Sequence, residues 1–473
     1  MAFEGEITAA IGKRVSIRLL EKLGGSESFR DILGVLQDET TVVKRDGSLA
    51  KFDSADIAFF RVVPVFNRRD LSSGEVKLYD TRNRRVEEIA TPGSPVTIYC
   101  CGPTVYRDAH VGNMRTFLLA DLAVRALELA GHETTLIQNI TDVGHMADDI
   151  NEDAGGDKVL EEGQRQSLSA LEIAQKYEER FHQDLRLLNI KPADRYPRAS
   201  ESIELIIKSI EKLVDKGFAY VGSDHNVYFD AQRFESYGAI SGNKLDQLKP
   251  GHRYEYTGDG GKKFHADWAL WKVASDRSEM VWPSPWGIGF PGWHIECSAM
   301  SCDLLGEHFD IHGGGADLQF PHHENEIAQS EGALYGQDHK ASDAPFVNYW
   351  MHNGHIRVNE EKMSKSLGNF FLIRDVLKNF DPEVLRFFML RAHYRSPINY
   401  SDAQLEEARS GLVRLYTALA QVQLGNRSVE PDPIWAKRFA DAMNDDFNTP
   451  EAIAALFDLA SEVNRAQGED KVR

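Results

Sequence analysis

The chain has 473 residues, 42% hydrophobic and 27% charged, with a formal net charge of −19. Its length predicts about three domains, and its acidic balance excludes a protein that binds nucleic acid unspecifically by neutralising phosphates. The sequence has no apolar stretch of about 18 residues that could span a membrane, and its acidic N-terminus does not match a signal peptide. We therefore expect a cytoplasmic protein that meets no membrane and has four reduced cysteines.

Residues 1–66 predict a small β-barrel. Apolar and polar residues alternate over 14–20, which is the pattern of a half-buried strand. Further short strand patterns follow, and Asp46-Gly47 is a hairpin signal. The segment resembles the SH3-like domains that precede some bacterial acetyltransferases, and the polar residues 67–74 predict a linker to the rest of the chain.

Residues 75–380 predict an α/β domain. A buried strand begins at Val96 and ends in glycine, apolar positions recur at helical spacing over 117–129, and 134–140 predicts a second strand. Strand, turn, helix and strand in this order form a βαβ unit, which implies a parallel sheet. Ligands of such sheets bind at the turns beyond the carboxyl ends of the strands, where His110 would lie.

Two more regions complete the predicted architecture. Residues 145–290 predict an insertion of helices, strands and loops, and the α/β domain resumes with a strand over 346–351. Residues 381–473 contain about four stretches of helical periodicity, which predict a helical bundle. The predicted fold is therefore a Rossmann-type parallel-sheet domain with an inserted subdomain, a C-terminal helical bundle and an N-terminal β-barrel.

The first chemical motif is His110-Val111-Gly112-Asn113, at the predicted turn from strand to helix. His110 and Asn113 are three residues apart at a helix start and so share a face; both could point at one phosphate group. Gly112 allows a ligand to approach the backbone closely. A histidine near a helix start can equally cap or pack the helix, so the motif alone leaves both interpretations open.

The second motif is Lys362-Met363-Ser364-Lys365-Ser366, which a glycine follows two residues later. Two lysines separated by small polar residues in such a loop can move and clamp a polyphosphate. The alternative is a solvated cluster of charges. The order and separation of the two motifs favour the polyphosphate.

A third pattern predicts a metal site. The candidate ligands are Cys101, Cys297, His322 and Glu326. His322 and Glu326 follow Pro321, which is favoured in a first helical turn, and their spacing of four residues directs both side chains to one side. Two thiolates, an imidazole and a carboxylate form a plausible tetrahedral Zn²⁺ site. His323 and Cys302 are rival ligands, and the alternative is that the cysteines are merely buried.

These motifs resemble the cysteinyl-tRNA synthetases, a family of class I aminoacyl-tRNA synthetases. The resemblance also includes CCGPTVY at 100–106, GWHIECSAM at 292–300 and FPHHENE at 320–326, and it spans residues 76–466. It implies an enzyme that uses ATP with Mg²⁺ to convert L-cysteine to cysteinyl-adenylate. The enzyme then transfers the cysteine to the 3′ end of tRNA(Cys), and one Zn²⁺ selects the thiol.

The resemblance also implies roles for individual residues. The zinc ligands are Cys101, Cys297, His322 and Glu326, and the cysteine pocket contains Thr141, Trp293 and His312. The ATP-binding residues are His110, Gly112, Asn113, Gly313, Gly314, Gly315, Asp317 and Lys365. The catalytic residues are His110, Asn113, Lys362 and Lys365, which would stabilise charge at the α-phosphate and align the reactants.

The chain departs from the family pattern at both ends. The N-terminal barrel is additional to the family core, and the sequence stops at Arg473, about where the family continues into an anticodon-binding region. We expect a monomer without that region. One alternative is a cysteine ligase acting on a small amine, as in mycothiol biosynthesis, but that branch lacks a counterpart of Glu326. A second alternative is a non-catalytic synthetase-like RNA-binding protein, which the intact motifs disfavour.

Overall fold

The computed structural model describes residues 4–23, 26–44, 48–62, 76–89, 95–146, 156–245, 261–336, 344–358, 361–362, 370–422 and 432–466. The chain divides into two compact units, Met1–Arg69 and Asp70–Arg473. The predicted Asp46-Gly47 turn, the linker and Lys365 lie outside the described residues. No helix in the described ranges is long and apolar enough to cross a membrane.

The first unit contains a five-stranded antiparallel sheet beside the short helix α1 (Glu4–Ala9). The strand order is β4 (Leu49–Lys51), β3 (Thr41–Val43), β2 (Ser26–Asp38), β1 (Arg14–Leu23) and β5 (Ile57–Val62). Val15, Ile17 and Leu19 alternate into the core and are at most 2% exposed, as the period of a strand requires. The pairings of the described strands do not close the sheet, so the predicted barrel is not confirmed.

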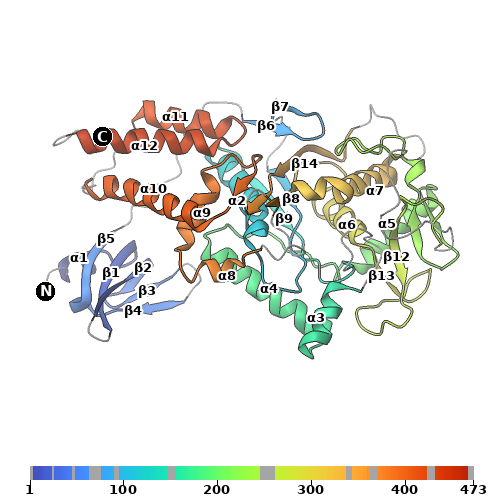
Figure 1. Ribbon diagram of the computed structural model, residues 1–473, viewed down its shortest axis with the longest axis horizontal. Coiled ribbons are helices and arrows are strands. Elements are labelled where there is room, and N and C mark those ends of the chain that lie inside the picture. The colour runs from blue at the N-terminus through green and yellow to red at the C-terminus, as the bar shows by residue number, and fades with distance from the viewer. Residues whose placement is uncertain are drawn as a thin grey trace. The chain divides into compact units, whose positions relative to one another are not determined.

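The second unit is built on a parallel sheet, which confirms the predicted Rossmann-type fold (Figure 1). Its strand order is β15 (Val347–Asn353), β14 (Phe309–Gly315), β8 (Val96–Cys100) and β9 (Thr134–Gln138). Helix α2 (Val111–Leu129) connects β8 to β9. The connection from β8 therefore runs to its neighbour β9 on one side of the sheet, whereas the connection from β14 runs to β15 on the opposite side. The carboxyl ends of β8 and β14 form a topological switch point, where ligands of such sheets bind.

The insertion contributes helices and a second sheet. Helices α3 (Lys158–Gln166), α4 (Ala170–Leu187) and α5 (Ile203–Asp215) precede an antiparallel sheet of β10 (Ala219–Val221), β11 (Val227–Phe229), β12 (Trp268–Val273) and β13 (Gly289–Pro291). Helices α6 (Trp293–Leu305) and α7 (Glu324–Tyr335) follow this sheet and β14 respectively. Large buried side chains such as Phe229 and Trp271 join the second sheet, α5, α6 and α7 into one hydrophobic core.

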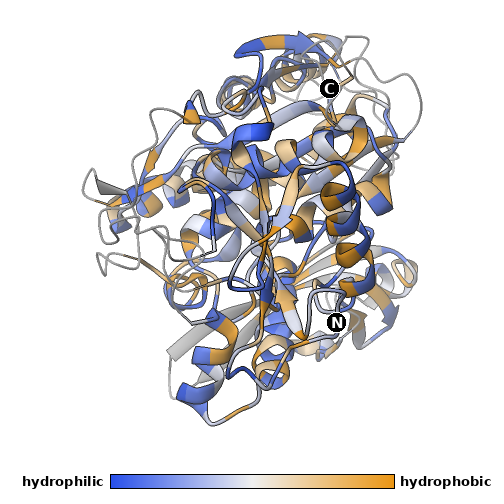
Figure 2. Ribbon diagram, turned by 90° about the vertical axis from the view of Figure 1, so that its right-hand side faces the viewer, coloured by the Kyte–Doolittle hydropathy of each residue, from blue (hydrophilic) through white to orange (hydrophobic). Residues whose placement is uncertain are grey.

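The remaining elements of the second unit include five helices and five short strands. They are α8 (Ile373–Val376), α9 (Pro382–Leu390), α10 (Asp402–Ala420), α11 (Pro433–Asn444) and α12 (Thr449–Arg465), with the short strands β6 (Lys77–Asp80), β7 (Arg85–Glu88), β16 (Ile356–Val358), β17 (Glu361–Lys362) and β18 (Ile398–Asn399). Figure 2 shows hydrophilic and hydrophobic residues mixed along the same helices, as expected for amphipathic helices. α9 to α12 correspond to the four predicted helical stretches.

Candidate metal and nucleotide site

Three segments that are distant in sequence meet at the switch point. Cys101 directly follows β8, and its N–H donates to the carbonyl of Gly313 in β14 at 3.2 Å. Cys297 lies on α6, one turn after Trp293. After β14 the chain makes a 3₁₀ turn over Ala316–Leu318 and then a kinked turn over Gln319–His323, in which Phe320 is extended, before α7 begins. Those turns place His322 and Glu326 beside the two cysteines.

Two groups of four buried side chains could each hold a metal ion, with ligand atoms all within 4.8 Å of one another. One group is Cys101, Cys297, His322 and Glu326, and the other is Cys101, His312, His323 and Glu326. The first group is the predicted zinc set. His323, a rival ligand in the sequence, belongs to the second group, whereas Cys302 belongs to neither group found in the described ranges.

Glu326 lies at the centre of the cluster. One carboxylate oxygen, Oε1, is 3.1 Å from His322 Nε2 and 3.9 Å from Cys101 Sγ, and the other accepts a 2.9 Å hydrogen bond from His312 Nε2. Cys101 Sγ is also 3.3 Å from His323 Nε2. The donor set of two sulfurs, one imidazole nitrogen and one carboxylate oxygen suits Zn²⁺ rather than a hard cation.

Two histidines that the sequence analysis did not single out orient the inner imidazoles. Nδ1 of His322 is 2.7 Å from Nδ1 of His294, and Nδ1 of His323 is 2.7 Å from Nε2 of His352. Because Nδ1 of His322 and His323 is engaged in these hydrogen bonds, Nε2 of each ring is directed toward the cluster. Hydrogen bonds from outer residues generally orient metal-binding histidines in this way. His294 stands within the segment 292–300 and His352 directly after the predicted strand 346–351, but no local spacing relates either residue to its partner.

The charges of the cluster favour a cation. A hydrogen bond from Cys101 lowers the pKa of the Cys297 thiol to about 6, while burial raises the pKa of Cys101 well above its ordinary value. Burial opposes ionisation of Glu326, yet His312 and His322 outweigh it and lower its pKa to about 2. Burial likewise opposes a charge on His322, but Glu326 and Cys297 raise its pKa to about 10. Buried anions of this kind need a partner charge or a metal.

Two of the three predicted cysteine-pocket residues, Trp293 and His312, contact members of the same cluster. The indole of Trp293 stacks on His322, with ring centroids 4.2 Å apart. His312 is fully buried and stacks on Trp350 at 4.5 Å. Thr141 is 2% exposed, and its hydroxyl donates to Oε2 of Glu296 at 3.2 Å, on the same helical turn as Cys297. Thr141 thus contacts the residue before Cys297 rather than a member of the cluster, and a shared pocket of the three side chains stays a prediction.

His110 and Asn113 form a capping box at the start of α2. The backbone N–H of Asn113 donates to His110 Nδ1, and the backbone N–H of His110 donates to the Asn113 side chain, both at 3.1 Å. This cap explains why α2 begins at Val111, earlier than the apolar periodicity predicts. A side chain on Gly112 would approach the His110 ring to 2.9 Å. The capping interpretation is thus confirmed, and phosphate binding by His110 and Asn113 stays a prediction.

The glycine run at the end of β14 lies beside the metal cluster. A Cβ on Gly313 would lie 2.7 Å from Cys100 Sγ, and one on Gly314 would lie 2.6 Å from the ring of His323. Any side chain there would collide with the packed groups, so both positions require glycine. Asp317 follows on an exposed turn. This geometry suits the close approach of a nucleoside.

Of the two lysines, only Lys362 falls within a described element. It lies in β17, which pairs antiparallel with β16. Lys365, predicted to contact ATP, lies outside the described residues.

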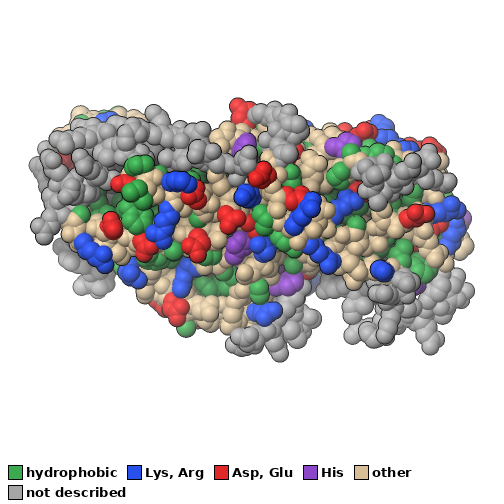
Figure 3. Space-filling view, turned by 90° about the horizontal axis from the view of Figure 1, so that it is seen from above, with side chains coloured by type: hydrophobic (Ala, Val, Ile, Leu, Met, Phe, Trp, Pro, Cys, Tyr) green, Lys and Arg blue, Asp and Glu red, His purple; other side chains and the backbone are tan. Residues whose placement is uncertain are grey.

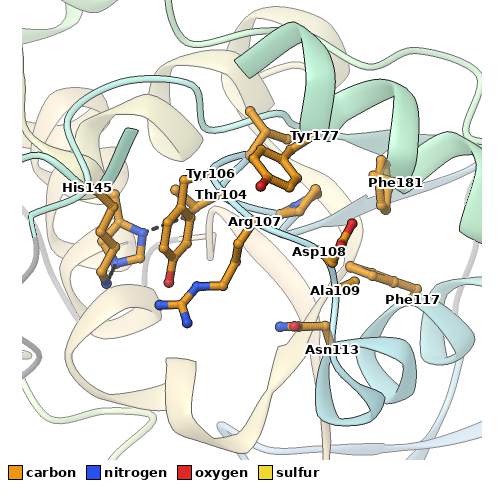
Figure 4. Close-up of a pocket in the computed structure, with 13 residues that line it drawn as sticks. Thr104, Tyr106, Arg107, Asp108, Ala109, Asn113, Phe117, His145, Tyr177 and Phe181 are labelled. Carbon is orange, nitrogen blue, oxygen red and sulfur yellow. Dashed lines mark hydrogen bonds between the residues drawn. The ribbon is translucent and has the colours of Figure 1, made fainter. Parts of the chain in front are cut away.

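A pocket of about 140 Å³ lies next to the capping box (Figure 4). It is lined by Pro103, Thr104, Val105, Tyr106, Arg107, Asp108, Ala109, Asn113, Phe117, His145, Lys158, Tyr177 and Phe181. Most of these residues come from the turn between β8 and α2 and from α4. Figure 4 shows the guanidinium of Arg107 between His145 and Asn113, and this guanidinium lies 4.4 Å from the ring of Tyr106. The pocket thus lies between His145, Lys158 and the start of α2, and its lining includes none of the candidate metal ligands.

The face of the molecule drawn in Figure 3 does not present one sign of charge. In Figure 3, Lys and Arg side chains are interspersed with Asp and Glu side chains over the face shown. This agrees with the net charge of −19 and with recognition of a specific partner rather than unspecific nucleic-acid binding.

Comparison with known proteins defines the class. Residues 89–410 match the family model described as the tRNA synthetases class I (C) catalytic domain, and residues 438–473 match the DALR domain. The parallel sheet with a ligand site at its switch point is the fold of that class. The chain is a class I aminoacyl-tRNA synthetase.

Its relatives define the family. A cysteine–tRNA ligase from Polynucleobacter necessarius is 57% identical over 406 residues, covering 84% of this chain and 82% of the relative. A cysteine–tRNA ligase from Cupriavidus taiwanensis is 50% identical, covering 82% and 80%. The chain belongs to the cysteine–tRNA ligase family.

Solved structures of other synthetases share the fold. A methionyl-tRNA synthetase from Mycobacterium tuberculosis in complex with methionyl-adenylate has a TM-score of 0.52 at 14% identity, covering 79% of this chain and 82% of that one. A putative arginyl-tRNA synthetase from Campylobacter jejuni has a TM-score of 0.52 at 13% identity, covering 80% and 88%. At such identities the likeness supports the fold alone.

Proposed function

We propose that the chain activates L-cysteine with ATP and transfers it to the 3′ end of tRNA(Cys). The observation that carries this proposal is the buried Cys101–Cys297–His322–Glu326 cluster at the switch point of a class I synthetase sheet. The names of relatives at 50–57% identity support tRNA, rather than a small amine, as the acceptor. We further propose that the enzyme is a cytoplasmic monomer.

Cys101, Cys297, His322 and Glu326 would hold one Zn²⁺. When bound, Zn²⁺ supplies selectivity, because it binds a thiolate far better than the hydroxyl of serine and lowers the pKa of the thiol. A pocket that relied on shape could discriminate little between two amino acids that differ in one atom. Trp293, Thr141 and His312 would form the walls that place the substrate side chain.

The other motifs would perform the activation. The carboxylate of cysteine is already ionised and attacks the α-phosphate of ATP, displacing pyrophosphate, so no general base is required. His110, Asn113, Lys362 and Lys365 would align ATP with Mg²⁺ and stabilise the developing negative charge. Gly313–Gly315 and Asp317 would bind the adenosine. The ribose hydroxyl at the tRNA 3′ end then attacks the adenylate carbonyl and releases AMP.

The test is cysteine-dependent exchange between ATP and radiolabelled pyrophosphate, followed by charging of total tRNA. We expect exchange with cysteine, little exchange with serine, and charging of tRNA(Cys). Exchange without charging would instead support a small-amine acceptor. The absence of exchange would contradict both enzymatic functions and leave an RNA-binding role.

A further inference from the structure

Trp293 stacks on a second imidazole besides His322. Its indole and the ring of His145 are nearly parallel, with centroids 4.2 Å apart and planes at 7°. The Trp293–His322 stack has the same separation, with planes at 26°. One aromatic side chain therefore contacts both the predicted zinc ligand and a histidine outside the cluster, and no role has so far been assigned to that histidine.

Both ring nitrogens of His145 are engaged. Nδ1 is 2.6 Å from the hydroxyl of Thr104, and Nε2 is 2.8 Å from Nζ of Lys158. A lysine ammonium can only donate, so Nε2 of His145 accepts and Nδ1–H donates to Thr104. Figure 4 shows the bond between His145 and Thr104 at one side of the pocket. The two bonds determine the plane of the imidazole.

The two anchors of His145 are themselves held in place. Thr104 lies three residues after Cys101 and pairs with Thr141 in an isolated β-bridge. Lys158 begins α3, and its backbone N–H donates to the carbonyl of His145 at 3.0 Å. Asp157 caps α3 and also accepts from the N–H of Gly144 at 2.8 Å. The ring of His145 is thus fixed on rigid backbone on both sides.

We propose that His145 is a positioning residue for cysteine: it holds Trp293 in place, and Trp293 holds the ring of His322. Trp293 and Cys297 share a face of α6 because they are four residues apart. Fixing the indole therefore sets both one wall of the cysteine pocket and the start of the helix that carries a thiolate ligand. This inference rests on the proposed function, because it assigns His145 to recognition of cysteine.

The test compares His145→Ala, which removes the stacked ring, with His145→Phe, which keeps a flat ring but no hydrogen bonds. Loss of an orienting partner typically costs about 10–100-fold in metal affinity or activity. In pyrophosphate exchange, His145→Ala should therefore raise KM for cysteine by about tenfold or more and change KM for ATP by less than about twofold. His145→Phe should restore most of the cysteine KM.

Zinc retention gives a readout independent of activity. We expect His145→Ala to lose zinc to a chelator faster than the unaltered protein, and His145→Phe to lose it at an intermediate rate. The matched control is His132→Ala. His132 precedes β9 at the amino edge of the parallel sheet, away from the switch point, and its replacement should change neither KM nor zinc retention.

Three results would overturn the inference. They are a cysteine KM for His145→Ala within about twofold of the unaltered protein, an equal rise in KM for ATP, and a His145→Phe variant as impaired as His145→Ala. If His145→Ala does not fold, His145→Leu, which fills the space but also removes the flat ring, is judged by the same first two criteria. If the unaltered chain shows no cysteine-dependent exchange, the proposed function fails, and zinc retention alone decides the role of His145.

Discussion

At the scale of single residues, the two thiols of α6 differ in what they face. Cys297 points into the cluster with Cys101, His322 and Glu326, whereas Cys302 lies five residues later and belongs to neither group of candidate ligands in the described ranges. Desolvation raises the pKa of the partly buried Cys302 thiol to about 11, which is typical of an unreactive thiol. The pair therefore offers a matched comparison.

Cys297→Ser should abolish zinc binding and discrimination against serine. Removing an outer partner alone typically weakens metal binding about 10–100-fold, and a direct thiolate ligand should contribute more. The measurements are zinc content after dialysis and the ratio of exchange rates with cysteine and serine. Cys302→Ser should retain both properties, and equal zinc loss in the two variants would contradict the ligand assignment.

At the scale of elements, the turn after β8 depends on close backbone approach. The N–H of Gly102 donates to the Asn139 side chain at 2.9 Å, and a Cβ on Gly102 would lie only 1.6 Å from the carbonyl oxygen of Asn139. Since Cys101 precedes this glycine, the contact that packs the turn against the end of β9 also positions a ligand.

Gly102→Ala should destabilise the protein by about 1–3 kcal/mol, the usual range for overpacking, and should weaken zinc binding. Equilibrium denaturation in urea measures the first effect. The matched control is Gly332→Ala in α7, where the new Cβ would meet Phe218 at an ordinary 3.4 Å and alanine favours the helix by about 1 kcal/mol. Equal destabilisation by the two changes would refute the argument.

At the scale of the whole molecule, hydrogen bonds to Asp446 connect the C-terminal helices to the rest of the second unit. Its carboxylate accepts from the N–H of Tyr79 at 2.9 Å, from the hydroxyl of Tyr394 at 2.5 Å and from Arg395 Nε at 2.7 Å. Asp446 is 3% exposed and sits between α11 and α12. One buried carboxylate thus joins β6, the segment after α9 and the last two helices.

Asp446→Asn should destabilise the protein by about 1–3 kcal/mol, because it removes the negative charge from buried, charge-assisted hydrogen bonds. Its neighbour Asp445 is exposed, so Asp445→Asn should change stability by less than about 0.5 kcal/mol. Thermal or urea unfolding of both variants tests the comparison. If Asp446→Asn lowers the free energy of unfolding less than Asp445→Asn does, the hydrogen bonds to the Asp446 carboxylate do not stabilise the fold.

The N-terminal unit should be dispensable for cysteine activation. Among the described residues, its hydrophobic cluster contains residues between Ile7 and Phe60, and the matched catalytic family model begins at residue 89. A chain of residues 70–473 should therefore exchange pyrophosphate with KM for cysteine and ATP within about twofold of the full chain. A tenfold loss of exchange would show that this unit contributes to the active site.

Local patterns in the sequence determined much of the fold. Helical periodicity located α9 to α12, the strand–helix–strand order predicted the parallel sheet, and a spacing of four residues placed His322 and Glu326 on one side. These inferences succeed because backbone periodicity is a property of neighbouring residues. The bounds of α2 were less predictable, since a histidine and an asparagine cap it instead of a commoner residue pair.

The tertiary structure decided which distant side chains meet. Cys101, Cys297 and His322 come from three segments, and no local pattern selects His322 over His323, which joins a second possible ligand group. His294, His352 and His145 lie on separate segments and gain their roles only when the sheet, α6 and α7 pack together. The sequence by itself determined where most helices and strands form and which chemical motifs stand at their ends. Only the packing of those ends around one switch point brought the ligands and their orienting partners into contact, because such contacts depend on the whole fold.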